Sequence, residues 1–174
     1  MPTTDPISAV VVSVTLPGAL ERVRRRHDVA AASGAPAHVT LLFPFLPVTR
    51  LEPHVRRELA EIARGVTPFE IRFAEVGRFP GVVYLAPEPT APFVRLTASI
   101  VAQFPDYPPY GGTHPEIIPH LTLAQSDEGT LDAVAAVAQK SLPFTRRVPA
   151  IQLLVEDTTG RWRTRWRIPL GVRS

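Results

Sequence analysis

The sequence has no cysteine, a single lysine (Lys140) and no long hydrophobic run. Without cysteine, the chain has no disulfides, no thiolate metal site and no cysteine nucleophile. No apolar run approaches the ~20 residues that span a bilayer, and residues 1–5 lack the basic and apolar segments of a secretory signal. We therefore expect a cytoplasmic monomer with no membrane partner.

The composition is that of a folded domain. The 174 residues are 45% hydrophobic and 20% charged, and 19 basic residues against 16 acidic ones leave a net charge of +3. Arginine replaces lysine almost throughout, and there are 20 prolines. We interpret both biases as background composition. The alternative for arginine is recognition of phosphate, which its planar, bidentate side chain suits.

Hydrophobic patterns and turn residues predict alternating strands and helices. The first predicted helix carries a solvated basic face, made of Arg22, Arg24, Arg25 and Arg26. The expected strands cover residues 7–16, 38–45, 68–75, 82–85, 118–125, 144–155 and 162–170. The expected helices cover residues 19–32, 51–64, 93–104 and 131–141, and a loop covers residues 105–115.

The order of elements contains a repeat. A strand with His-x-Thr, a helix and a hairpin opened by Pro-Phe begins at His38 and again at His120. The two Pro-Phe pairs are Pro68-Phe69 and Pro143-Phe144. Two units suggest a duplicated pair of α/β lobes. We predict an α+β fold in which residues 1–174 form one bilobal domain with a central cleft, a natural place for a ligand.

The repeated motifs are His38-Val39-Thr40-Leu41 and His120-Leu121-Thr122-Leu123. Alternate residues of a strand point to opposite faces, so each histidine lies beside its threonine while the apolar residues face the core. If the lobes are related by an approximate twofold axis, both pairs converge on one ligand. Two imidazoles can act as base and acid near neutral pH, and two hydroxyls can donate to phosphate oxygens. This set suits a phosphodiester.

With these motifs, the chain resembles the two-histidine phosphoesterase superfamily, whose LigT-like members are described as 2′-5′ RNA ligases or RNA 2′,3′-cyclic phosphodiesterases. The resemblance implies antiparallel sheets that flank a cleft and a site made of His38, Thr40, His120 and Thr122. It also implies cleavage of a 2′,3′-cyclic phosphate or a 2′-5′ phosphodiester of RNA ends or small nucleotides, with no metal or cofactor. By this analogy His120 is the base and His38 the acid, with the roles exchanged in the ligation direction.

Several residues outside the motifs are candidates for binding substrate. Arg163 and Arg165 belong to a final strand on which arginines alternate with Trp162 and Trp166. We expect its arginines on one face and its aromatic residues on the other, as a solvated outer strand or as a track for RNA phosphates. Tyr110 could stack on a base. Arg78 and Tyr84, in the first hairpin, are placed to reach the cleft.

Two other functions remain open. A non-catalytic module could bind RNA or a nucleotide in the same cleft without turnover. A metal-dependent hydrolase would need His114, Glu116 and His120 as ligands. Their spacing matches no standard zinc pattern, so we expect no metal site.

Overall fold

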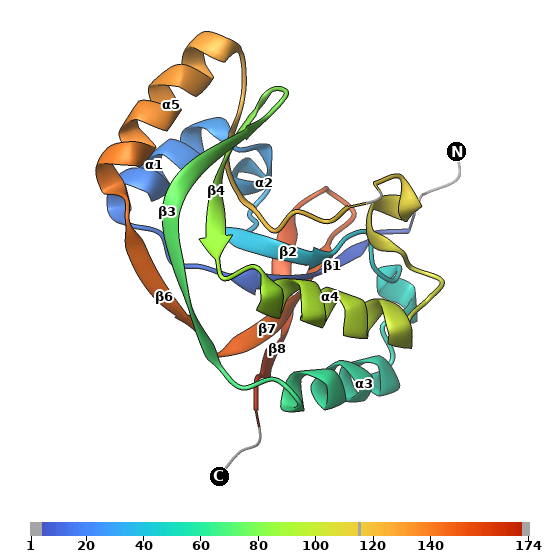
Figure 1. Cartoon of the computed structure of the whole chain (residues 1–174). Coiled ribbons are helices and arrows are strands. Elements are labelled where there is room, and N and C mark those ends of the chain that lie inside the picture. Colours follow the sequence, from blue (N-terminus) through green and yellow to red (C-terminus); the bar gives the residue numbers. More distant parts are fainter. Residues whose placement is uncertain (1–4, 115, 172–174) are drawn as a thin grey trace.

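Two four-stranded antiparallel sheets form the centre of the structure, a computed structural model that describes residues 5–114 and 116–171 (Figure 1). The His38 sheet has the strand order β2-β1-β7-β8, and the His120 sheet has the order β5-β4-β3-β6. The strands are β1 (Ser8–Ser13), β2 (His38–Leu42), β3 (Phe69–Phe79), β4 (Val82–Glu88), β5 (Leu121–Gln125), β6 (Phe144–Val148), β7 (Ala150–Glu156) and β8 (Trp162–Pro169). The predicted α+β class is confirmed.

Parts of three predictions lie outside the described residues. These are the ends of the predicted domain (1–4 and 172–174), nearly all of the segment 1–5 considered for a signal, and Pro115 at the end of the predicted loop.

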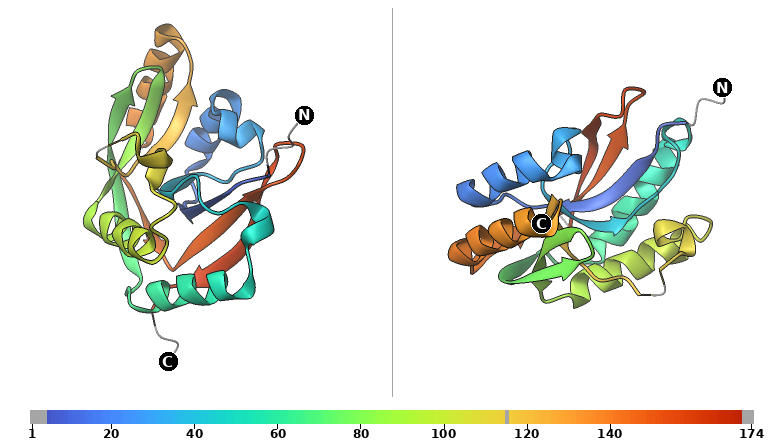
Figure 2. Two further views of the ribbon diagram at one scale, coloured as in Figure 1. Left: turned by 90° about the vertical axis from the view of Figure 1, so that its right-hand side faces the viewer. Right: turned by 90° about the horizontal axis from the view of Figure 1, so that it is seen from above.

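Helices pack at both ends of the paired sheets. They are α1 (Gly18–His27), α2 (Val29–Ala32), α3 (Pro53–Arg64), α4 (Ala91–Gln103) and α5 (Glu128–Ser141), with 3-10 turns η1 (Val48–Arg50) and η2 (Pro109–Gly112). Helix α1 lies beside α5 and contacts β5 of the His120 sheet. Helix α3 packs on β8 and helix α4 on β2, both in the His38 sheet (Figures 1 and 2). The helices therefore join the two sheets into one body.

The first predicted helix, residues 19–32, is interrupted at Asp28, so this prediction is corrected. Asp28 has an extended backbone (φ −105°, ψ 120°), and its carboxylate accepts the Ala30 N–H, which starts the short helix α2. The predicted basic face is also partly wrong. Arg24 is 2% exposed because its guanidinium pairs with the equally buried Asp28.

The first hairpin is longer than predicted. Strand β3 continues through Gly77 to Phe79, and the turn is confined to residues 80–81. Gly77 is not a turn residue. It pairs with Tyr84 across the strands, and a Cβ at Gly77 would come within 2.2 Å of the Tyr84 ring. Glycine is required there because the aromatic ring lies over its backbone.

The second hairpin is not the single pair of arms expected from residues 144–155 and 162–170. The first arm breaks at Pro149, where the chain passes from one sheet to the other. Strand β6 pairs with β3, while β7 pairs with β1 and β8. Proline has no N–H to give to a ladder, so it suits this crossing point. Both Pro-Phe segments consequently lie in the His120 sheet.

Strand β8 does not separate arginines from aromatic residues as predicted. A bulge in β8, opposite Leu153 and Leu154 of β7, leaves Arg165 without a partner, so Trp166 pairs with Leu153 and Trp162 with Glu156. Cross-strand partners share a face. Trp166 therefore packs on the main core with Leu153, whereas Trp162 packs on the opposite face of the His38 sheet. The extra residue shifts the alternation on which the prediction rested.

The main core holds the sheets in place. It includes Phe45, Phe73 and Phe93, which are almost completely buried, and the leucines that follow the motif threonines. Burying one such side chain stabilises the fold by about 1.5–3 kcal/mol. The motif strands are thus anchored on one face by the core and left open on the other.

Candidate active site

The two histidine motifs occupy equivalent edges of the two sheets. Strand β2 is the outer strand of the His38 sheet, strand β5 is the outer strand of the His120 sheet, and these two edges contact each other. In both strands the apolar residue between histidine and threonine is buried, and the histidine and threonine are half-buried on the other face. The alternation predicted from the sequence is therefore present in both motifs.

One cavity of about 190 Å³ is lined by all four motif side chains, His38, Thr40, His120 and Thr122. Arg24, Asp28, Ala30, Tyr110 and Gln125 complete its lining. The structure thus brings together, around one small volume, two imidazoles and two hydroxyls from segments 82 residues apart.

Each imidazole is held by the same backbone contact. His38 Nδ1 lies 2.7 Å from the Pro36 carbonyl oxygen, and His120 Nδ1 lies 2.7 Å from the Ile118 carbonyl oxygen. A carbonyl oxygen can only accept, so each Nδ1 carries the proton that it donates. In the neutral ring this leaves the Nε2 lone pair free to take a proton. The two histidines are therefore fixed in one orientation and one tautomer.

Each motif strand also contains a bulge one residue after its threonine. Leu41 has no partner between Thr40 and Leu42, and Leu123 has none between Thr122 and Ala124. The extra residue reverses the facing of the side chains after it. It places Phe43 in a cavity beside His38, and it places Gln125 in the cavity shared by all four motif residues.

Comparison with known proteins agrees with this arrangement. The family model of the 2′-5′ RNA ligase superfamily matches residues 12–160. The chain belongs to this superfamily. The match confirms the resemblance to LigT-like two-histidine phosphoesterases. No curated protein sequence matches the chain.

Solved structures share the fold. TT0787 of Thermus thermophilus is 21% identical, with a TM-score of 0.61 over 96% of this chain and 100% of that one. LigT of E. coli in its apo form is 18% identical, with a TM-score of 0.58 over 97% of this chain and 100% of that one. LigT complexed with 3′-AMP has the same identity, TM-score and coverage. These similarities show that the LigT-like fold extends over nearly the whole chain.

In this LigT-like protein, a buried ion pair supports His38. Arg24 Nε lies 3.0 Å from Asp28 Oδ2, and each side chain is 2% exposed. The Arg24 guanidinium also donates to the carbonyl oxygens of Ala35 (3.0 Å) and Pro36 (3.2 Å). The Pro36 carbonyl oxygen therefore accepts from both Arg24 and His38. Burial, and to a lesser extent the Arg24 charge, lower the pKa of His38.

Aromatic rings support His120 instead. The His120 ring makes edge contacts with Phe79 and Tyr84 at centroid distances of 5.2 and 5.5 Å, and those two rings stack on each other at 4.4 Å. Tyr84 pairs with Thr122 across the strands. Although the sequence predicts that Tyr84 binds substrate, it does not line the cavity with the four motif residues. It contacts the histidine.

Tyr110, predicted to stack on a base, lies at the cleft. It lines the central cavity and a larger one on each side, of about 420 and 580 Å³. Its backbone has a positive φ of 52°, and its N–H donates to the Phe43 carbonyl oxygen at 2.6 Å. Burial raises the pKa of its hydroxyl, which keeps the group protonated and able to donate a hydrogen bond.

Three predicted substrate ligands do not reach these cavities. Arg78 forms ion pairs with Glu128 (3.5 Å) and Asp132 (2.7 Å) of α5, which hold its guanidinium on the surface. Arg163 and Arg165 are exposed on β8, at the edge of the His38 sheet opposite β2. None of the three lines the three cavities around Tyr110.

Other residues at the site were missed in the sequence. Arg24 and Asp28 stand four apart, the spacing of a helical ion pair, but a charged run of arginines hid the pair. The positions of Phe43 and Gln125 in the cavities depend on the two bulges. Consecutive apolar residues after each threonine, Leu41-Leu42 and Leu123-Ala124, are the signal that could have revealed them.

The described residues, 5–114 and 116–171, contain no group of three or more acidic or histidine side chains placed to hold a metal ion. No helix among them is long and apolar enough to cross a membrane.

Proposed function

We propose that this protein is a phosphodiesterase that hydrolyses a 2′,3′-cyclic phosphate or a 2′-5′ phosphodiester of RNA ends or small nucleotides. Membership of the superfamily supports phosphoesterase chemistry in general. The observation that carries the finer proposal is the central cavity, where two anchored imidazoles and two threonine hydroxyls surround about 190 Å³. A relative with this fold, LigT, has been crystallised with 3′-AMP, a ligand of the proposed class.

The proposed reaction needs one base and one acid. Nε2 of the neutral histidine takes a proton from water, and the hydroxide attacks phosphorus. Charge builds on the non-bridging oxygens, where Thr40 and Thr122 donate hydrogen bonds. The second, protonated imidazole gives its Nε2 proton to the leaving sugar oxygen. A cyclic phosphate becomes a phosphomonoester, and exchange with solvent restores both histidines.

We assign the base to His38 and the acid to His120, opposite to the assignment that the resemblance favoured. Burial and the nearby Arg24 guanidinium lower the pKa of His38, so its ring is neutral at pH 7 and Nε2 can accept a proton. His120 then supplies the proton for the leaving group from the other side of the cavity.

Replacement of each histidine tests the proposal. Nucleoside 2′,3′-cyclic phosphates are the substrates, and the phosphomonoester product is quantified. We expect His38→Ala and His120→Ala each to lower kcat/KM by about 10²–10⁴-fold, the usual contribution of a general acid or base. His54→Ala, an exposed histidine on α3, is the matched control. Full activity in either motif variant would refute the paired-histidine mechanism.

Two further measurements separate the alternative functions. Calorimetry should show that both motif variants still bind a 3′-nucleotide. Binding without turnover by the unaltered protein would favour the non-catalytic module. Loss of activity in chelator, with recovery on addition of a divalent metal, would favour a metal-dependent hydrolase.

A further inference from the structure

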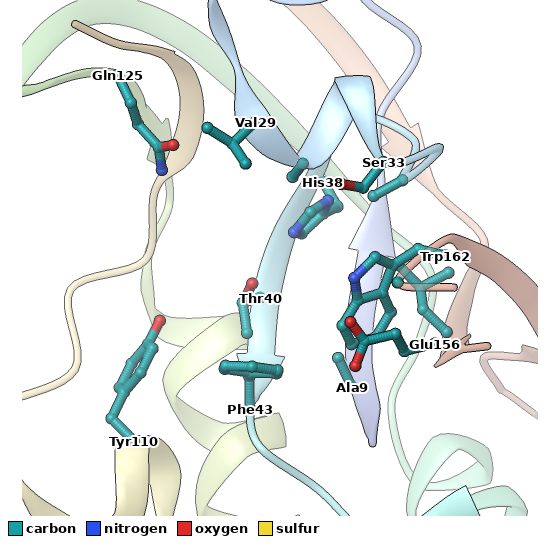
Figure 3. A pocket seen from close by; sticks show the side chains of 14 residues that line it. Ala9, Val29, Ser33, His38, Thr40, Phe43, Tyr110, Gln125, Glu156 and Trp162 are labelled. Carbon is teal, nitrogen blue, oxygen red and sulfur yellow. The ribbon is translucent and has the colours of Figure 1, made fainter. Parts of the chain in front are cut away.

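The cavity on the His38 side of the centre is a distinct pocket of about 420 Å³, which we call the Trp162 pocket. It shares His38, Thr40, Tyr110 and Gln125 with the central cavity. Figure 3 shows Tyr110 and Gln125 on one side of β2, with Trp162 and Glu156 on the other. A ligand with its phosphate between the histidines can therefore extend into this pocket without leaving the protein surface.

The walls of the Trp162 pocket suit a flat ring. Phe43 and Trp162 meet edge to face at a centroid distance of 6.1 Å. Small residues line much of the rest, namely Ala9, Ala30, Ser33, Ala35 and Gly160. Aromatic side chains beside an open apolar space bind nucleobases through stacking and edge contacts. These walls suit a base better than a second phosphate.

Glu156 gives this pocket its polarity. It pairs with Trp162 across β7 and β8, so the carboxylate and the indole share one face. Within the described part of the chain, no arginine, lysine or histidine forms a salt bridge with Glu156. An ionised carboxylate only accepts hydrogen bonds, and it repels phosphate. Its natural partner is a ligand edge that carries adjacent N–H groups.

We propose that the Trp162 pocket is a guanine subsite and that the substrate is a guanosine nucleotide. Guanine presents N1–H and the 2-amino group side by side, so one carboxylate can accept from both in a bidentate pair. This inference rests on the proposed function for the position of the phosphate. It adds the identity of the base.

The other bases lack this edge. Adenine and cytosine each place a ring nitrogen acceptor beside the amino group, and uracil flanks its single N–H with two carbonyl oxygens. Each would set an acceptor against the Glu156 carboxylate and leave both acceptors without a donor, which is costly. Selectivity for guanine therefore arises as much from repulsion of the wrong edge as from attraction of the right one.

Rates with the 2′,3′-cyclic phosphates of all four nucleosides test the subsite. We expect kcat/KM for guanosine to exceed that for adenosine by about 10- to 100-fold, as for a hydrogen-bonded pair that includes a charged group. Glu156→Gln should remove at least tenfold of that ratio, because an amide offers guanine only one acceptor. Glu75→Gln, an exposed glutamate on β3, makes the same charge change away from the pocket and should keep the ratio.

Binding separates this inference from the proposed function. Calorimetry with 3′-GMP and 3′-AMP on the His120→Ala protein measures base preference without turnover. Tighter binding of 3′-GMP that is lost in Glu156→Gln supports the subsite even if no substrate is hydrolysed. Equal affinities for the two nucleotides, or a preference that survives in Glu156→Gln, would overturn it even if hydrolysis is fast.

Discussion

The two halves of the site present the same groups to the cleft but support them differently. In each half a histidine donates to a carbonyl oxygen two residues earlier, and a bulge follows the threonine. Behind His38 lies the buried Arg24–Asp28 pair, whereas the rings of Phe79 and Tyr84 lie against His120. The halves agree in the groups that the proposed mechanism needs to hold one phosphate. They diverge in the packing behind the histidines, where burial and the Arg24 charge lower the pKa of His38.

The largest effect should come from the ion pair behind His38. Arg24→Met leaves the Asp28 carboxylate buried without a charge partner, which typically destabilises a fold by about 3–5 kcal/mol. The matched control is Arg25→Met on the same helix. Arg25 also pairs with an acid four residues away, Glu21, but its side chain is 76% exposed, so the loss should be about 0–1 kcal/mol. Urea denaturation of both variants measures the difference.

A second variant keeps this prediction testable if Arg24→Met fails to fold. Arg24→Met combined with Asp28→Asn removes both charges and retains an oxygen that can accept the Ala30 N–H. It should recover part of the stability, since no charge is left unpaired. Equal stability losses in Arg24→Met and Arg25→Met would show that the pair behind His38 has no special role.

This contrast also explains what could be predicted from the sequence. Period-two alternation places His38 and Thr40 together, and duplication places His120 and Thr122 opposite them. Neither argument can locate a bulge, because one extra residue reverses the facing of every later side chain. For this reason the sequence could not predict the facing of Phe43 and Gln125 or the separation of the two tryptophans. In the sequence Arg24 is likewise one of several neighbouring arginines. Only tertiary packing distinguishes it, because it buries this arginine and leaves the others exposed.

The aromatic support of His120 can be disturbed through Gly77. In Gly77→Ala, the new Cβ would meet the Tyr84 ring, so we expect a loss of about 1–3 kcal/mol from overpacking. The displaced ring should also move His120 and lower kcat. Gly129→Ala, in α5 where the nearest atom would lie 3.5 Å away, is the control and should not be destabilised. Thermal unfolding and rates on one cyclic phosphate test both effects.

Tyr84→Ser in the Gly77→Ala background identifies the cause. If the clash is responsible, the double variant should lose less stability than the sum of the two single changes. Strict additivity would mean that Gly77 acts through its backbone and not through the ring that covers His120.

The smallest expected effect is a difference in pH dependence. Because burial and Arg24 lower the pKa of His38, its folded-state titration should fall below the ordinary value of 6.5. The Asp28 carboxylate and the Pro36 contact act in the opposite direction, and the His120 charge adds to the lowering. NMR titration of the imidazole signals, assigned with His38→Gln, gives the midpoint directly. The acid limb of kcat/KM should follow the same group.

The sign of the stability change provides an independent check. Since the unfolded chain binds the His38 proton more readily than the folded one, the neutral ring contributes stability above the unfolded pKa. That contribution is lost as the pH falls through the folded pKa, and it should be absent in His38→Gln. A His38 midpoint at or above 6.5, or unfolding curves with the same pH dependence in the two proteins, would remove the physical basis for making His38 the base. The two halves would then differ in packing alone.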